Sequence, residues 1–350
     1  MDIRDNNVIF LLGAGCSFEA GIPLSIQMVN EIHSLISTNS KWTPYEDLYY
    51  YLRSAIQFSE GIHGKFDSTF NVEKLLTIMT ELEKREKNSI YPFIGGWNSR
   101  LLDVAGPNFE KIKQLRELIR EKLFDWLIPR HHDKGIYYKG FGDFKQTIGC
   151  PIRIFTLNHD LLFEKTLSDQ FNIEQGFDKA DHKWDYSNFE QGDHADIHFF
   201  LYKLHGSVDW LRDDSSIIQV DNHTNEADII FGIEGKLKSE DPYLYYASEL
   251  RKWTLSPDCK LIISIGYSHS DDYINRLLGQ SLKKQTNRKL LVVGPVDDGA
   301  KTAQYVATQI GMENCDQIAI KNETASSFLS SLSDLNNLSP FFGADKEAPF

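Results

Sequence analysis

Val8-Ile9-Phe10-Leu11-Leu12 opens the stretch of sequence that decides the fold, and Gly13-Ala14-Gly15-Cys16-Ser17-Phe18-Glu19-Ala20-Gly21-Ile22-Pro23 follows it directly. The apolar run predicts a buried strand of a parallel sheet. Glycines at its end let the backbone approach a pyrophosphate, and N–H groups that open a helix favour an anion. The dehydrogenase fingerprint G-x-G-x-x-G would need glycine in place of Phe18. An ordinary nicotinamide dehydrogenase is therefore disfavoured. The alternative to a pyrophosphate-binding loop is a glycine-rich turn that only packs against its neighbours.

Strand-like runs alternate with helical ones after Pro151. The strand candidates are Ile152 to Thr156, Phe199 to Leu204, Ile229 to Phe231, Leu261 to Ile265 and Leu290 to Val293. Helical patterns fall at about 160–168, 271–283 and 300–310. This alternation predicts an α/β fold, a Rossmann-like parallel sheet with helices on both faces.

The segment between the first strand and this alternating region shows helical patterns only. Apolar residues recur at helical spacing from Ser25 to Ile36, after the capping residue Asn71, and from Ile112 to Leu127. We therefore predict a large helical insertion after the first strand. Residues 1–30 and 146–335 would form the core, 31–145 the insertion and 336–350 a C-terminal tail. Such an insertion can cover a ligand cleft as a lid or form subunit contacts.

The charge balance argues against direct binding to nucleic acid. The 350 residues include 37 Lys+Arg and 50 Asp+Glu, a net charge of −13, whereas phosphate backbones are bound mainly through Lys and Arg. No apolar run approaches the roughly 20 residues that cross a bilayer. The polar start lacks the apolar core of a signal peptide. We therefore expect a cytoplasmic protein without a membrane interaction.

The cysteines are few and scattered. Cys16, Cys150, Cys259 and Cys315 are far apart in the sequence, whereas a zinc module needs closely spaced pairs. Several histidines and aspartates lie between 181 and 198, but no helical H-x-x-x-H accompanies them. We predict neither zinc nor another metal site.

Two further motifs follow strand candidates. Thr156-Leu157-Asn158-His159-Asp160 and His205-Gly206-Ser207-Val208-Asp209-Trp210 both begin where a strand should end. Parallel α/β sheets bind ligands at the carboxyl ends of their strands, which would bring Asn158, Asp160 and His205 toward one crevice. A histidine there can act as a general base near neutral pH. The alternatives are that Asn158 or Asp160 only caps the following helix and that His205 is a structural residue.

Taken together, these motifs resemble the sirtuin family. In sirtuins a glycine-rich loop ending in Gly-Ile-Pro, a Thr-x-Asn-x-Asp motif and a His-Gly motif occur in this order. Gly266-Tyr267-Ser268 after Leu261 to Ile265 is similar to the Gly-x-Ser turn that sirtuins place on the cofactor phosphates and ribose. The resemblance covers about residues 8 to 24 and 150 to 320.

Departures from the sirtuin deacylases indicate a particular branch of the family. Gly-Ile-Pro continues with Leu24-Ser25-Ile26 rather than Asp-Phe-Arg, and the four-cysteine zinc module after the catalytic histidine is absent. The chain is similar instead to the sirtuin-like NAD hydrolases of bacterial anti-phage defence, which share the run Gly-Tyr-Ser-x-Ser-Asp-Asp found at residues 266–272. That resemblance implies an NAD-depleting effector that acts as an oligomer. It also implies a partner such as a HerA-type ATPase or an Argonaute.

The resemblance also implies roles for individual residues. Asn158 would position water or a ribose hydroxyl, His205 would be the general base, and Asp160 would bond the nicotinamide carboxamide. The cofactor-binding residues would be Gly13, Ala14, Gly15, Ser17, Ile22, Pro23, Asp160, Gly266 and Ser268. Asp271-Asp272 is expected to cap the following helix. A non-catalytic module that senses NAD or ADP-ribose and an NAD-dependent protein deacylase are the alternatives.

Overall fold

β1 (Val8–Leu12) is the central strand of a seven-stranded parallel sheet in the computed structural model. The model describes residues 3–64, 70–83, 99–128, 132–190, 196–213, 216–221, 227, 229 and 240–342. Within these residues the chain forms two compact units. One contains the residues up to Ile22 and from Ile128 onward, and the other is Pro23–Leu127.

The sheet has the strand order β3-β4-β2-β1-β7-β8-β9, and all of its pairs are parallel. β1 lies between strands from much later in the chain, which is the arrangement predicted for a strand followed by an insertion. The other strands are β2 (Ile152–Thr156), β3 (Ile173–Glu174), β4 (Phe199–Lys203), β7 (Leu261–Ile265), β8 (Lys289–Val293) and β9 (Ile318–Lys321). β5 (Trp210–Asp213) and β6 (Ser216–Gln219) form a separate antiparallel pair.

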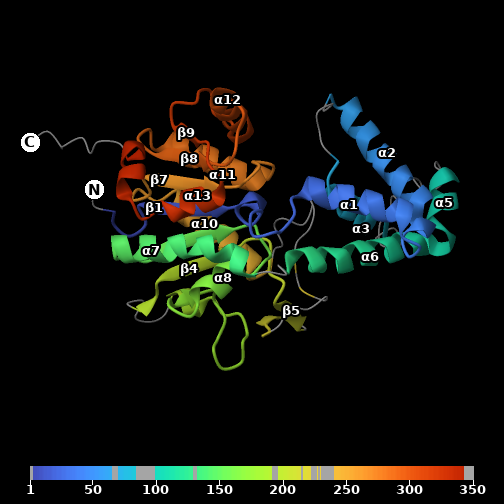
Figure 1. Ribbon diagram of the computed structural model, residues 1–350, viewed down its shortest axis with the longest axis horizontal. Helices are drawn as coiled ribbons and strands as arrows, with labels where there is room; N and C mark the ends of the chain where they lie inside the picture. Colours follow the sequence, from blue (N-terminus) through green and yellow to red (C-terminus); the bar gives the residue numbers. More distant parts are fainter. Residues whose placement is uncertain are drawn as a thin grey trace, which may run out of the picture. The chain divides into compact units, whose positions relative to one another are not determined.

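Helices cover both faces of this sheet, as the sequence predicts (Figure 1). Phe10 contacts Phe141 of α7 (Lys139–Ile148) at 5.2 Å between ring centroids. On the opposite face Arg153, which is paired in register with Ile9, lies 3.7 Å from the ring of Trp253 of α10 (Tyr243–Thr254). Because side chains alternate between faces along a strand, these contacts place helices on both sides.

The remaining helices of this unit surround the strands. They are η1 (Ala14–Cys16), η5 (His132–Tyr138), α8 (Leu162–Leu167), α9 (Ser187–Glu190), α11 (Asp272–Lys284), α12 (Gly299–Ile310), α13 (Ala325–Ser330), η7 (Leu335–Asn337) and η8 (Ser339–Phe341). α7, α8, η5 and α13 pack on one another, and α11 packs on both α10 and α12.

The second unit is helical throughout its described residues. It contains α1 (Ser25–Thr38), η2 (Thr43–Tyr45), α2 (Glu46–Ile62), α3 (Val72–Glu83), α5 (Ser99–Ala105), η4 (Pro107–Phe109) and α6 (Glu110–Leu127). The expected cap Asn71 accepts a hydrogen bond from the N–H of Lys74 at 2.8 Å. Apolar residues at helical spacing form its core, among them Ile32, Leu75 and Leu115.

Several boundaries differ from the prediction. The helical unit is Pro23–Leu127 rather than 31–145, because Phe141 and Phe144 of α7 pack on Phe10 of the sheet. Leu338, in the expected tail, is fully buried, and residues 343–350 lie outside the described residues.

The short strands were the hardest elements to predict. β3, β5, β6 and β9 were missed because each has only two to four residues and lacks a continuous apolar run. Ile229 forms an isolated bridge with Gly206. Residues 230 and 231 of that strand candidate lie outside the described residues.

Candidate active site

The candidate site lies where four parallel strands end. β4, β2, β1 and β7 are consecutive neighbours in the sheet, so the loops that follow them meet at one edge. Each of the motifs identified in the sequence occupies one of these loops. This is the position at which open α/β sheets bind ligands.

The glycine loop after β1 packs closely on the loop after β7. The N–H of Gly13 donates to the carbonyl of Ile265 and the N–H of Gly15 to the carbonyl of Gly266, both at 2.9 Å. A Cβ at Gly13 would lie 2.6 Å from Cα of Tyr267, so only glycine permits this approach. The amides of Gly13 and Gly15 are therefore already used within the protein.

Ala14 differs from its two glycine neighbours. It is exposed, and its N–H makes no hydrogen bond among the described residues. The Ala14 amide is therefore available to an anion.

Ser17 joins the glycine loop to the segment after β2. Its hydroxyl donates to Asp160 Oδ2 at 2.8 Å and accepts from Asn158 Nδ2 at 2.9 Å. The hydroxyl of Tyr138 lies 3.0 Å away. Because Ser17 has a single hydroxyl hydrogen, which Asp160 receives, Tyr138 must donate the third bond. Ser17 is 1% exposed and fully hydrogen-bonded, so its hydroxyl organises the site rather than lying open to a phosphate.

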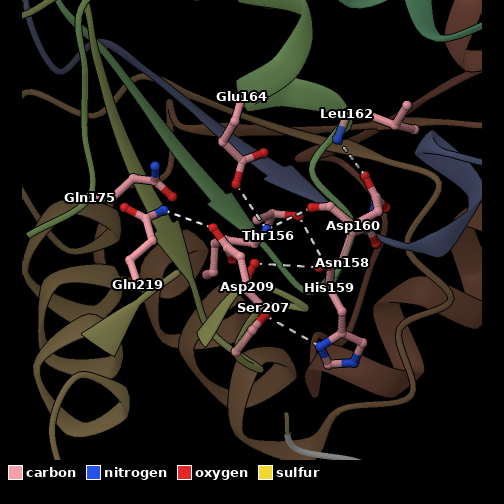
Figure 2. A network of polar contacts seen from close by, with 12 residues as sticks. Thr156, Asn158, His159, Asp160, Leu162, Glu164, Gln175, Ser207, Asp209 and Gln219 are labelled. Atoms are coloured by element: carbon pink, nitrogen blue, oxygen red, sulfur yellow. Dashed lines mark hydrogen bonds and ion pairs between the residues drawn. The ribbon is translucent and has the colours of Figure 1, made fainter. Parts of the chain in front are cut away.

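These bonds hold Asn158 in one orientation. Its backbone N–H donates to Thr156 Oγ1 at 3.0 Å, and its Nδ2 is bound to Ser17. Figure 2 shows Asn158, His159 and Asp160 on the segment that follows Thr156. Asn158 Oδ1 makes no hydrogen bond among the described residues and is not fully buried. The amide oxygen is therefore open to a ligand.

Asp160 is buried and serves the local structure. Its Oδ1 accepts the N–H of Leu162 at 3.0 Å at the start of α8, although the N-cap residue of this helix is Leu161 (Figure 2). Burial raises the pKa of Asp160, and the nearby Lys203 opposes this shift. The amino group of Lys203 donates to the Asp160 carbonyl at 2.6 Å and to Glu164 Oε1 at 2.9 Å. Both carboxylate oxygens of Asp160 therefore have protein partners.

His205, after β4, lies beside a carboxylate. Its Nε2 is 3.4 Å from Asp271 Oδ2, and both residues are buried. His205 Nδ1 makes no hydrogen bond among the described residues and is not fully buried. One ring nitrogen thus faces an acid, and the other is open.

Asp271 is also the cap of α11, as the sequence predicted. Its Oδ1 accepts from the N–H groups of Tyr273 at 3.0 Å and Ile274 at 3.2 Å. No local pattern indicates that the same carboxylate reaches His205, because the two residues are 66 positions apart in the sequence and only the fold brings them together.

His159 is a second buried histidine of the site. Its Nδ1 is 3.3 Å from the carbonyl of Gly206, and its ring centroid lies 6.3 Å from that of His205. Burial lowers the pKa of His159 to about 3, with a smaller contribution from the charge of His205. His159 is therefore neutral at physiological pH, and its Nδ1 is the protonated nitrogen that donates to Gly206.

The other predicted cofactor-binding residues are spread along these loops. Gly266, with a φ of 62°, donates its N–H to Val293. Ser268 is exposed, and its hydroxyl lies 2.9 Å from that of Ser270. Ile22 is buried at the end of the glycine loop, whereas Pro23 begins the helical unit.

Tyr137 and Tyr138 are site residues that the sequence did not reveal. The Tyr137 hydroxyl donates to the carbonyl of Cys16 at 2.6 Å, and Tyr138 contacts Ser17. Both belong to η5, inside the stretch predicted to be insertion, and no motif marks them. Burial raises the pKa of Cys16 to about 12, which fits a packing thiol.

Neither a metal-binding cluster nor a membrane-spanning helix is found in the described part of the chain. No group of three or more His, Cys, Asp or Glu side chains there is arranged to hold a metal ion. His194 and Asp193, part of the histidine-rich stretch noted in the sequence, lie outside the described residues. No helix among the described residues is long and apolar enough to cross a membrane.

One family model and one solved structure are similar to this chain. Residues 152–313 match the family model of the SIR2-like domain, a stretch that includes Asn158, His205 and Asp271. No curated protein matches the sequence. Among solved structures, the chain is similar to one described as Sir2Tm bound to a propionylated peptide. The two have 14% sequence identity, the match covers 95% of this chain and 93% of that chain, and the TM-score is 0.34. Residues 152–313 are therefore similar to a SIR2-like domain.

Proposed function

We propose that this protein hydrolyses NAD at the bond between nicotinamide and ribose. One observation carries the proposal: two acceptor atoms, Asn158 Oδ1 and His205 Nδ1, are open at the ends of adjacent strands. The SIR2-like domain match supports NAD as the ligand. A site that only bound NAD would have no need of an open imidazole beside a positioned amide.

The donors of the site fit a dinucleotide. The Ala14 amide and the Ser268 hydroxyl would bind the pyrophosphate, while Gly13, Gly15 and Gly266 would shape the floor beneath it. Ser17 and Asp160 would act indirectly, by fixing Asn158 and the start of α8. Ile22 and Pro23, at the end of the glycine loop, are proposed as cofactor-binding residues on the resemblance alone.

The reaction requires little covalent chemistry from the protein. NAD supplies a good leaving group, because the pyridinium departs as neutral nicotinamide. Asn158 Oδ1 would hold water or a ribose hydroxyl, and His205 would accept the proton that water loses as it bonds to the ribose carbon. The products are nicotinamide, ADP-ribose and one proton, which His205 returns to solvent.

In the cell this activity would deplete NAD. We propose that the protein is a cytoplasmic effector of anti-phage defence that works as an oligomer with a sensing partner, such as a HerA-type ATPase or an Argonaute. The net charge of −13 supports delegation of nucleic-acid sensing to such a partner. The resemblance to the sirtuin-like NAD hydrolases of anti-phage defence supports the effector role, the oligomer and the sensing partner.

The test is nicotinamide release from NAD by the full chain, alone and with co-purifying proteins. Removal of the base should lower turnover by about 10²- to 10⁴-fold in His205→Ala while NAD binding, measured by calorimetry, persists. Asn158→Ala should also lose most turnover. His182→Ala is the control, because His182 is exposed and lies in none of the four loops of the site.

Three outcomes would overturn the proposal. Full activity in both site variants would remove Asn158 and His205 from the reaction. Stable NAD binding without release under every condition would favour the sensing module. Release that depends on an acylated peptide would favour the deacylase.

A further inference from the structure

We infer that Asp271 is a positioning residue that fixes both the orientation and the tautomer of His205, so that His205 accepts its proton at Nδ1. The structural part of this inference stands on the contacts of Asp271. The effect of Asp271 on NAD turnover rests on the proposed function. The two parts are tested by separate measurements.

The two oxygens of Asp271 have different tasks. Oδ1 accepts the N–H groups of Tyr273 and Ile274 at the start of α11. Oδ2 lies 3.4 Å from His205 Nε2. Because the helix cap fixes the plane of the carboxylate, it also fixes the oxygen that the imidazole meets.

Neighbouring hydrogen bonds hold this carboxylate in place. The N–H of Asp271 donates to the Tyr267 hydroxyl at 3.1 Å, and that hydroxyl is 3.1 Å from Asn275 Oδ1. Asn275 Nδ2 donates in turn to the carbonyl of His269 at 2.7 Å. Asp271, Tyr267 and Asn275 are buried. The loop after β7 and the first turn of α11 therefore form one rigid support.

The carboxylate determines which imidazole nitrogen carries the hydrogen. An ionised carboxylate only accepts hydrogen bonds, so hydrogen on Nε2, which lies 3.4 Å from Oδ2, is favoured over a lone pair there. Neutral His205 is thus held with hydrogen on Nε2 and a lone pair on Nδ1. When water or a ribose hydroxyl gives its proton to Nδ1, the charge of the imidazolium develops beside Asp271. The proton then leaves Nδ1 to solvent, and the starting tautomer is restored.

Asp271→Asn tests this arrangement without removing the cap. The two backbone N–H groups of α11 require an oxygen, so the asparagine carbonyl must take the place of Oδ1. Its NH₂ group then faces His205 Nε2 and can only donate. The substitution therefore favours the other tautomer, with hydrogen on Nδ1, and blocks the nitrogen that should accept the proton.

The kinetic experiment compares Asp271→Asn with Asp298→Asn in the full chain. Asp298 caps α12 in the same way, with Oδ1 accepting from Ala300 and Lys301 at 3.0 and 3.1 Å, but its Oδ2 lies 3.7 Å from Lys301 Nζ rather than from an imidazole. We expect kcat for NAD to fall about tenfold to a hundredfold in Asp271→Asn with KM within about twofold. Asp298→Asn should leave both unchanged, and the two variants should lose similar thermal stability. A kcat within twofold of wild type would overturn the role of Asp271 in turnover.

The structural experiment needs no turnover. In wild-type chain labelled with ¹⁵N-histidine, long-range ¹H–¹⁵N correlation at neutral pH reports the tautomer of His205, whose signals are assigned by their loss in His205→Ala. We expect hydrogen on Nε2 in wild type and on Nδ1 in Asp271→Asn. Hydrogen on Nδ1 in wild type would overturn the inference even if NAD hydrolysis is confirmed. The expected tautomer in a protein without NAD turnover would uphold the positioning and contradict the proposed function alone.

Discussion

Asn158, after β2, is held by neutral hydroxyl groups, whereas His205, on the adjacent β4 side, lies beside a carboxylate. The hydroxyl of Ser17 fixes the Asn158 amide and is itself satisfied by Asp160 and Tyr138. Among the described residues, the His205 imidazole has a close polar contact to Asp271, and its second nitrogen makes no hydrogen bond.

The different surroundings of Asn158 and His205 suit two different functions, orientation of a reactant and transfer of a proton. A residue that orients a reactant must not move, and a closed set of hydrogen bonds gives it one position. A residue that exchanges a proton needs an open nitrogen and a nearby charge that stabilises its protonated form. Breaking the first set should therefore cost folding stability, whereas changing the second should cost turnover.

Ser17→Ala should have the larger effect on stability. It removes three hydrogen bonds and leaves the Asp160 carboxylate and the Asn158 amide buried without this partner. We expect the free energy of unfolding to fall by about 2 to 4 kcal/mol, measured by calorimetry or denaturant titration. Tyr138→Phe, which removes one of the three bonds, should cost about 1 kcal/mol. Equal stability in Ser17→Ala and wild type would show that this network does not hold the site.

His159→Asn should change the pH dependence of stability below neutral pH. Folding lowers the pKa of His159 from 6.5 to about 3, so between these values the unfolded chain binds a proton that the folded chain does not. This contribution to stability is complete above pH 6.5 and is lost as the pH falls toward 3, at up to about 1.4 kcal/mol per pH unit. Asparagine can still donate to Gly206 but does not titrate.

The measurement is the free energy of unfolding between pH 4.5 and 7 in wild type and variant. The variant should show a shallower loss of stability on acidification, by about one proton. His182→Asn, at an exposed histidine, should follow wild type. A variant curve parallel to that of wild type would contradict a buried neutral His159.

The sequence predicts the sheet well because its central strands are continuous apolar runs. Val8 to Leu12 and Leu261 to Ile265 are fully buried, as their patterns indicate. The edge strand β9 was missed because it has only four residues. The core boundary at Ile128 could not be predicted, because the aromatic residues of α7 look the same whether they pack on a sheet or within a helical unit.

The site was predictable where a residue follows its own strand and not where the fold brings distant residues together. Asn158 and His205 were predicted as site residues from their positions after two strand candidates, and the structure confirms that they follow β2 and β4. Asp271 was identified only as a helix cap, because capping is local in sequence and its contact with His205 is not. Tyr138 had no local signal at all.

The most direct test of NAD hydrolysis by this protein is the product balance of the full chain incubated with NAD and no acylated peptide. We expect nicotinamide and ADP-ribose in equal amounts from wild type, and a rate lower by about 10²- to 10⁴-fold from His205→Ala with NAD binding retained. NAD that stays bound and intact in every preparation, or nicotinamide that appears only with an acyl acceptor, would contradict the account.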